Sequence, residues 1–270
     1  MSTSAKIVVV GGKGGVGKTS VSAVLVRLLL EAGGKLLVID ADPVVSVSYT
    51  LGEEPARTLG DFRQGLIENP AAQRELEKRP LKTSIRDLLT TSRRGYDLLA
   101  MGRAEGKGCF CGVNEMLRFG IESLCSDYDT VLIDCEAGIE QVNRRALHRI
   151  DELVLVADTS LRSMESVIKV RDIATFYNED RPLGTHVLIN RIAGEDDRRR
   201  AQATAAGLGL TIAGFVPEDE DVLRYNAEGR TLLELPDDAP SVAALRSVVM
   251  AILPSHAAGT ALQLASHPVP

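Results

Sequence analysis

Short apolar runs alternate with longer segments of helical length along most of the chain. The runs that predict strands are residues 6–10, 35–40, 97–101, 130–134, 152–157, 186–190 and 211–216. The first of them is rich in Val and almost wholly apolar, which is typical of a strand covered on both faces of a parallel sheet. A glycine-rich turn follows it directly.

The segments between these runs have the length and periodicity of helices. We expect helices at residues 19–32, 59–68, 112–126, 140–149, 163–177, 197–207 and 242–253. The first is apolar almost all round and stops at Gly33 and Gly34, which suits a helix packed on a sheet and ended by a glycine cap. The alternation predicts an α/β fold with a single doubly wound, mostly parallel sheet and helices on both faces.

Two stretches fall outside this alternation. Residues 50–96 are polar and punctuated by proline, with no clear strand, so we interpret them as helices and loops beside the sheet. The stretch after Pro254 is rich in small residues, and we expect it to be frayed. We therefore predict one domain at residues 1–254 and a flexible tail at residues 255–270.

Composition narrows the class of protein. Of 270 residues, 44% are hydrophobic and 25% charged, which excludes a disordered chain. A net charge of −6 and only 4% aromatic residues disfavour a broad nucleic-acid surface. No apolar run approaches the ~20 residues of a membrane-spanning helix, and no signal peptide is evident. We expect a cytoplasmic protein with neither nucleic acid nor membrane as partner.

The strongest chemical signal is a glycine-rich loop between the first predicted strand and helix. It fits G-x-x-x-x-G-K-[ST] with Gly12, Lys13, Gly14, Gly15, Val16, Gly17, Lys18 and Thr19. Such a loop aims backbone N–H groups at phosphate oxygens, at the positive end of the following helix. We expect Lys18 to neutralise the β- and γ-phosphates of ATP, the Thr19 hydroxyl to ligate Mg²⁺, and Ser20 to lie beside the nucleotide.

Three aspartates stand at the ends of predicted strands. Asp40 and Asp42 follow the second strand, and Asp134 ends the fourth. Ligands of open α/β sheets gather at this edge, and Asp134 fits the Walker B position, where a carboxylate holds the metal through water. Gly138, a few residues later, is placed to contact the γ-phosphate. The alternative for Asp40 or Asp42 is a carboxylate that only caps the turn before Pro43.

The form KGGVGKT, with its additional Lys13, resembles the deviant Walker A group of ATPases, which includes MinD, ParA, the nitrogenase iron protein and CooC. The resemblance implies a homodimer in which Lys13 reaches the partner's phosphates, much as an arginine finger does. It implies that Asp42 is the switch I aspartate that orients the attacking water, with Asp40 near the Mg²⁺ shell. The residues that it implies around adenine are Asn190, Arg191 and Pro217. The alternatives are a solvated loop lysine and, for Asn190, a turn former.

Cys109 and Cys111 form a C-x-C motif. In an extended backbone both thiols face one side and can share a metal ion. One chain offers two soft ligands where Zn²⁺ or square-planar Ni²⁺ takes four, so a symmetric dimer would have to supply the other pair. Taken alone, the motif is equally compatible with two incidental thiols.

In combination, these motifs resemble the CooC-type nickel-insertion ATPases that mature carbon monoxide dehydrogenase. The resemblance covers the segments KIVVVGGKGGVGKTS, GCFCGVNEMLR, DYDTVLIDCEAGIE, VLINR and FVPED. It implies hydrolysis of ATP to ADP, nucleotide-dependent dimerisation, Ni²⁺ or Zn²⁺ on Cys109 and Cys111, and a nickel enzyme as client. The chain departs from the family pattern at Val44 and Ser46, where switch I contacts are expected to differ, and at Gln141, where His is expected.

Two other functions stay open. A MinD- or ParA-like positioning ATPase would need a basic amphipathic helix or a basic patch, and no Lys or Arg follows Arg246. An iron–sulfur reductase would need two well-separated cysteines in each chain. Cys109 and Cys135 could serve, but Cys111 would then have no role.

Overall fold

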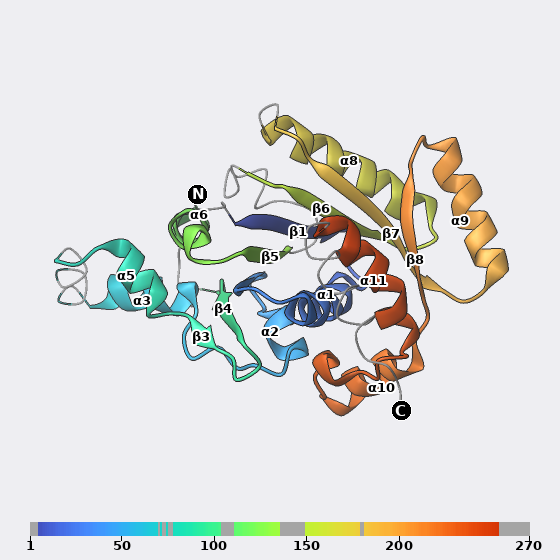
Figure 1. Cartoon of the computed structure of the whole chain (residues 1–270). Helices are drawn as coiled ribbons and strands as arrows, with labels where there is room; N and C mark the ends of the chain where they lie inside the picture. The colour runs from blue at the N-terminus through green and yellow to red at the C-terminus, as the bar shows by residue number, and fades with distance from the viewer. Residues whose placement is uncertain are drawn as a thin grey trace, which may run out of the picture.

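The computed structural model describes residues 5–69, 71, 74, 78–103, 111–135, 149–178 and 181–253 (Figure 1). Within these residues, eight strands form one sheet in the order β3-β4-β2-β5-β1-β6-β7-β8. The strands are β1 (Lys6–Gly12), β2 (Leu36–Ala41), β3 (Thr90–Thr91), β4 (Tyr96–Ala100), β5 (Thr130–Cys135), β6 (Glu152–Ala157), β7 (Gly184–Ile192) and β8 (Ile212–Pro217). Only the short edge strand β3 pairs antiparallel; the other pairs are parallel. The predicted fold class is confirmed.

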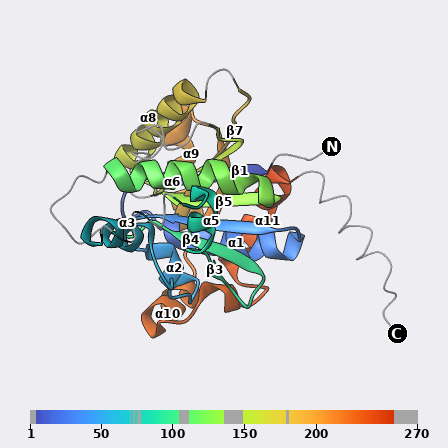
Figure 2. The ribbon, with the colours of Figure 1, turned by 90° about the vertical axis from the view of Figure 1, so that its left-hand side faces the viewer.

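Helices cover both faces of the sheet (Figures 1 and 2). One face carries α1 (Lys18–Ala32), α2 (Ser46–Thr50), α10 (Glu220–Glu228), the 3₁₀ turn η2 (Leu232–Glu234) and α11 (Pro240–Ile252). The other carries α3 (Leu59–Glu68), α5 (Leu81–Arg86), α6 (Cys111–Leu124), the 3₁₀ turn η1 (Cys125–Asp127), α8 (Leu161–Tyr177) and α9 (Glu195–Gly207). Along β1, Ile7 and Val9 enter one core, and Val8 and Val10 enter the other. This two-sided burial explains why the strand is apolar throughout.

The boundaries test the sequence predictions directly. All seven predicted strands are present, and β7 is longer than expected. The glycine cap of α1 is confirmed, because Gly33 has a φ of 84° and donates its N–H to the carbonyl of Leu30. The predicted helix at 140–149 falls almost entirely outside the described residues, and so does the predicted tail. The expectation of no strand within residues 50–96 is wrong at β3, a two-residue strand too short to show alternation.

Short elements account for the other differences. Helices α2, α5 and α10 and both 3₁₀ turns were not predicted. Five or six residues give too few turns for a helical period to be visible, so α2 and α5 depend on tertiary contacts. Helix α10 carried a usable signal, because Asp219 caps its first N–H groups and Gly229 ends it in a left-handed conformation.

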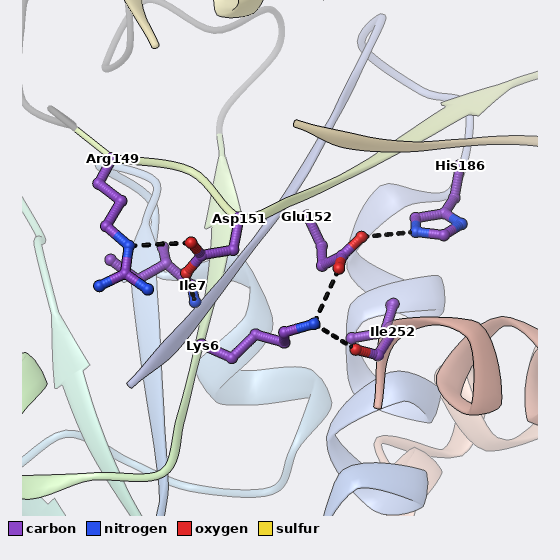
Figure 3. A network of polar contacts seen from close by, with 7 residues as sticks. All are labelled: Lys6, Ile7, Arg149, Asp151, Glu152, His186 and Ile252. Carbon is purple, nitrogen blue, oxygen red and sulfur yellow. Dashed lines mark hydrogen bonds and ion pairs between the residues drawn. The ribbon is translucent and has the colours of Figure 1, made fainter. Parts of the chain in front are cut away.

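The edge of the sheet where the strands begin is closed by a polar network (Figure 3). Lys6 Nζ donates to Glu152 Oε1 at 2.9 Å and to the carbonyl of Ile252 at 2.7 Å, and His186 Nε2 lies 2.9 Å from Glu152 Oε2. These contacts join β1, β6, β7 and the last residue of α11. The candidate site lies at the opposite edge, where the strands end.

Candidate functional site

The loop between β1 and α1 follows a course that glycine permits. Gly12 and Gly17 have positive φ angles of 146° and 91°. A Cβ atom on Gly12 would overlap the carbonyl oxygen of Val156, and one on Gly17 would overlap the side-chain amide of Asn190. Any other residue at Gly12 would force the loop away from the backbone of β6, and any other residue at Gly17 would displace the Asn190 amide.

The start of α1 has the features of an anion-binding site. No side chain caps its first N–H groups, because the residue before the helix is Gly17. Lys18 is only 8% exposed, and its Nζ donates to the carbonyl of Lys13 at 3.2 Å, inside the loop. Free N–H donors and a buried ammonium group at one helix end make a phosphate site.

Asp134 lies buried beside the first turn of α1. Its Oδ1 accepts from Ser22 Oγ at 2.6 Å and its Oδ2 from Thr19 Oγ1 at 3.3 Å. Burial raises the pKa of Asp134 to about 7; the hydrogen bonds from Ser22 and Thr19 and the charge of Lys18 oppose the rise, while the charge of Asp40 adds to it. The predicted proximity of Thr19 and Asp134 is present in the structure.

Asp40 is the second buried carboxylate, and it faces Asp134 in the register of β2 and β5. Its Oδ2 accepts from the backbone N–H and the hydroxyl of Ser48, at 2.9 and 2.8 Å. Burial raises the pKa of Asp40 to about 6, against the effect of these hydrogen bonds. Ionising both Asp40 and Asp134 is costly, because the two negative charges would lie side by side in a buried place. Their carboxylates and the Thr19 hydroxyl are oxygen donors of the kind that Mg²⁺ prefers.

Asp42 lies just beyond β2 and is half-buried. Its Oδ1 accepts from the N–H of Val44 and its Oδ2 from the hydroxyl of Ser46, both at 2.8 Å. The carboxylate therefore does cap the turn, as the alternative interpretation expected. An ionised carboxylate offers about four acceptor positions, so capping leaves capacity for a further contact.

A pocket lies beside the phosphate loop, between α1, α10 and the ends of β7 and β8. Its lining includes Ser20 and the three residues assigned to the base by resemblance, Asn190, Arg191 and Pro217. Asn190 Nδ2 donates to the carbonyl of Val16 at 2.9 Å. One amide N–H and the amide oxygen of Asn190 remain for a ligand.

The backbone of Arg191 explains how two successive residues of one strand reach the same pocket. Neighbouring side chains of a regular strand point to opposite faces. Arg191 has a φ of 61°, in the left-handed region, and the pairing of β7 with β8 is irregular between Ile189 and Ile192. A non-glycine residue in this conformation costs on the order of 1–3 kcal/mol and marks a local constraint.

Several functional contacts were not expected from the sequence. The hydroxyls of Ser22, Ser46 and Ser48 each reach one of the three carboxylates. Serines in these positions have no local pattern that distinguishes them from other serines. Asp219 also lines the pocket and accepts from the N–H of Ser241 at 2.9 Å, which brings the starts of α10 and α11 together.

The cysteine motif lies largely outside the described residues, as does Gly138. Cys111 is the first residue of α6, and nothing is described of its side chain or of Cys109. Helix α6 follows the parallel strand β4, so it begins at the same edge of the sheet as the phosphate loop. The guanidinium of Arg63 lies directly against Gly112. Cys125 and Cys135 pack in or against the core, and burial raises the pKa of both thiols.

Among the described residues, no three His, Cys, Asp or Glu side chains gather in a way that could hold a metal ion. In the same part of the chain, none of the helices combines the length and apolar character needed to cross a bilayer.

Comparisons with known proteins point to one group. The family described as "CobQ/CobB/MinD/ParA nucleotide binding domain" matches residues 7–232. The chain is 35% identical over 238 residues to the uncharacterized ATP-binding protein MJ0685 of Methanocaldococcus jannaschii, covering 86% of this chain and 92% of that one. It is 29% identical over 181 residues to the carbon monoxide dehydrogenase accessory protein CooC of Rhodospirillum rubrum, covering 62% and 68%. Among solved structures, septum site-determining protein MinD with Mg-ADP from Pyrococcus horikoshii superposes with a TM-score of 0.68, at 21% identity and 92% and 96% coverage.

Proposed function

Because the chain belongs to the CobQ/CobB/MinD/ParA nucleotide-binding family, we propose that it binds ATP at the loop of residues 12–19 and hydrolyses it within a homodimer. The observation that carries this proposal is the contact between Thr19 Oγ1 and Asp134 Oδ2, 3.3 Å apart, beside the buried Lys18. It joins the hydroxyl and the carboxylate that a magnesium–nucleotide complex needs at the uncapped start of α1.

Magnesium fits the oxygen donors of this site. Thr19 and Asp134 would hold the ion, and Asp40 is the neighbour of Asp134 in the sheet. Burial disfavours the charged form of both carboxylates, so a cation beside them would stabilise their ionised form. When bound, Mg²⁺ neutralises charge on the phosphate oxygens.

The chain's own residues perform the remaining tasks. The loop N–H groups and Lys18 hold the phosphates, and Lys18 offsets the negative charge that shifts to the leaving oxygen. Asp42 accepts a hydrogen bond from the attacking water and orients it toward the γ-phosphate. Asn190 and Arg191 hold the base, and the pocket around them is continuous with Gly17 of the loop.

The proposal of a dimer is supported by exposed side chains at this edge of the sheet. Lys13 is exposed, and so are Val44 after β2 and Leu161 after β6, at 73% and 52%. Val44 and Leu161 each follow a strand that ends at this edge, so burying their apolar side chains against a second copy would favour association. We propose that the second copy of the chain covers them and that Lys13 then contacts the nucleotide of the partner.

The test is ATP hydrolysis and light scattering with the full chain, in the presence of Mg²⁺. We expect the parent to hydrolyse ATP and to dimerise with it, and Lys13→Ala to lose most of both while still binding ATP. Lys35→Ala is the matched control, because Lys35 is an exposed lysine at the opposite edge of the sheet. A Lys13→Ala variant that dimerises and hydrolyses like the parent would exclude the role of Lys13 across the dimer.

We further propose that the ATPase is a metallochaperone, with Cys109 and Cys111 of both chains binding Ni²⁺ or Zn²⁺ as cargo for a nickel enzyme such as carbon monoxide dehydrogenase. The similarity to CooC supports it. So does the start of α6, because it places the backbone of Cys111 at the same edge of the sheet as the phosphate loop.

A MinD-like positioning ATPase is the second candidate. The chain is 26% identical over 253 residues to the septum site-determining protein MinD of Bacillus subtilis, covering 92% of this chain and 88% of that one, and this similarity favours it. Its output would be ATP-dependent attachment to a surface, with no requirement for either cysteine. An iron–sulfur reductase would instead show a broad charge-transfer band in the anaerobically purified protein. Stoichiometric nickel or zinc without that band supports the metallochaperone.

A further inference from the structure

Helix α2 supplies a serine hydroxyl to each of the two carboxylates at the end of β2. Ser48 Oγ donates to Asp40 Oδ2 at 2.8 Å, and Ser46 Oγ donates to Asp42 Oδ2 at 2.8 Å. The two serines are two residues apart, as are the two aspartates. Helix α2 is therefore held against the end of β2 by two parallel side-chain hydrogen bonds.

The two pairs differ in how much else holds the carboxylate. Asp40 is fully buried and also accepts from the N–H groups of Ser48 and Asp42. Asp42 is half-buried, and among the described residues its carboxylate accepts, besides Ser46, from the N–H of Val44, whose side chain is 73% exposed. The direction of the Asp42 carboxylate thus depends on these two donors, and the Ser46 hydroxyl is the one that a side-chain substitution removes.

Ser46 is attached to a fixed element, whereas Asp42 lies on a constrained turn. Val47 of α2 is fully buried in the core, and the carbonyl of Leu51 accepts from Thr231 Oγ1 at 2.8 Å. Between Asp42 and the helix, Val45 has a φ of 60°, which is a strained conformation for a β-branched residue. The Ser46 hydroxyl therefore lies at a fixed place beside Asp42 and determines which way the Asp42 carboxylate faces.

We propose that Ser46 is a positioning residue for ATP hydrolysis. Its hydroxyl occupies one acceptor position of Asp42 Oδ2 and holds the carboxylate, so that its remaining acceptor positions keep one direction for the attacking water. This inference rests on the proposed role of Asp42.

Two measurements on three variants test it. Ser46→Ala removes the hydroxyl and Ser46→Thr restores one. Thr50→Ala is the matched control, because Thr50 Oγ1 donates to the carbonyl of Ser46 within the same helix. We expect Ser46→Ala to lower kcat about tenfold, equivalent to about 1.4 kcal/mol of barrier, with KM for ATP changed less than about twofold. We expect Ser46→Thr and Thr50→Ala to keep kcat near that of the parent.

The second measurement does not require activity. Amide hydrogen exchange of Val44 reports whether Asp42 Oδ1 still accepts its N–H. We expect this exchange to become several-fold faster in Ser46→Ala, and to stay at the parent rate in Ser46→Thr and Thr50→Ala.

The outcomes separate this inference from the proposed function. Unchanged Val44 exchange in Ser46→Ala overturns the positioning role, whether or not the protein hydrolyses ATP. A loss of kcat that Thr50→Ala shares assigns the effect to helix stability and also overturns it. A parent protein that binds but does not hydrolyse ATP refutes the proposed function, and the exchange measurement still decides what Ser46 does to Asp42.

Discussion

Asn190 Nδ2 donates to the carbonyl of Val16 at 2.9 Å, and this contact joins the pocket between α1, α10 and the ends of β7 and β8 to the phosphate loop. The two residues are 174 positions apart in the chain. Asn190 is 8% exposed, and its side-chain amide lies so close to Gly17 that a Cβ atom at position 17 would overlap it. The amide of Asn190 thus belongs to the wall of the loop as well as to the pocket.

The first prediction concerns this amide. Asn190→Ala leaves the Val16 carbonyl without its side-chain donor and removes a contact to the base, so we expect ATP affinity to fall about 10- to 100-fold, in line with the ~1–3 kcal/mol of a buried polar group left unpaired. Isothermal titration with a non-hydrolysable ATP analogue measures it. Asn226→Ala, a change to an exposed asparagine on α10 at the same pocket, is the control. Equal losses in both variants would contradict a special role for Asn190.

The second prediction concerns the backbone of the loop. We expect Gly17→Ala to abolish nucleotide binding and to lower the free energy of unfolding, because its Cβ would overlap Asn190 and its φ of 91° is unfavourable for alanine. Gly207→Ala is the matched control, since a Cβ there meets no atom within 4 Å. It should be neutral or stabilise the protein by about 0.5–1 kcal/mol. Urea unfolding and nucleotide titration of both variants check the pair.

The third prediction concerns pH. The folded-state pKa of Asp134 is raised from 3.8 to about 7, and that of Asp40 to about 6, in both cases mainly by burial. Between pH 4 and 7 the folded state therefore binds more protons than the unfolded state, so the free energy of unfolding falls as pH rises, by up to about 1.4 kcal/mol per pH unit for each group.

Urea denaturation of the nucleotide-free protein in chelator, from pH 4.5 to 7.5, measures this slope. Asp134→Asn cannot ionise at that position and should flatten it. Saturating Mg²⁺ and ATP should reverse the loss at neutral pH, because bound cation and Lys18 favour the ionised carboxylates. A slope that is the same in the parent and in Asp134→Asn would contradict the assignment.

The fourth prediction follows from the metallochaperone proposal. With two thiols in each chain and four ligands around the metal, we expect about one Ni²⁺ or Zn²⁺ for two chains. Equilibrium dialysis on the parent and on the double variant Cys109→Ser/Cys111→Ser should show binding only in the parent. Cys125→Ser is the control, because burial keeps that thiol protonated, with a pKa of about 11. Undiminished binding in the double variant would exclude the motif as the metal site.

Much of the fold followed from local patterns. The seven predicted strands were found because each is a largely apolar run. The loop of residues 12–19 was found because its glycines and lysines stand at fixed spacing next to a strand and a helix. Helix α2 was missed, since five residues show no period and its stability comes from Val47 and Ser48 in the surrounding structure. The base contacts came from resemblance, and the sequence offered no physical reason for Arg191 to share a pocket with Asn190.

The sequence by itself determined the longer elements and the chemical groups at their ends, because periodicity, glycine spacing and strand composition act over a few residues. Only the tertiary structure decided which of those groups meet. The sheet order inserts β5 between β2 and β1, which sets Asp134 beside Asp40 and in reach of Thr19. The fold also brings Ser46 and Ser48 to the two aspartates of β2, a pairing that no local pattern of the chain contains because it depends on where a short helix packs.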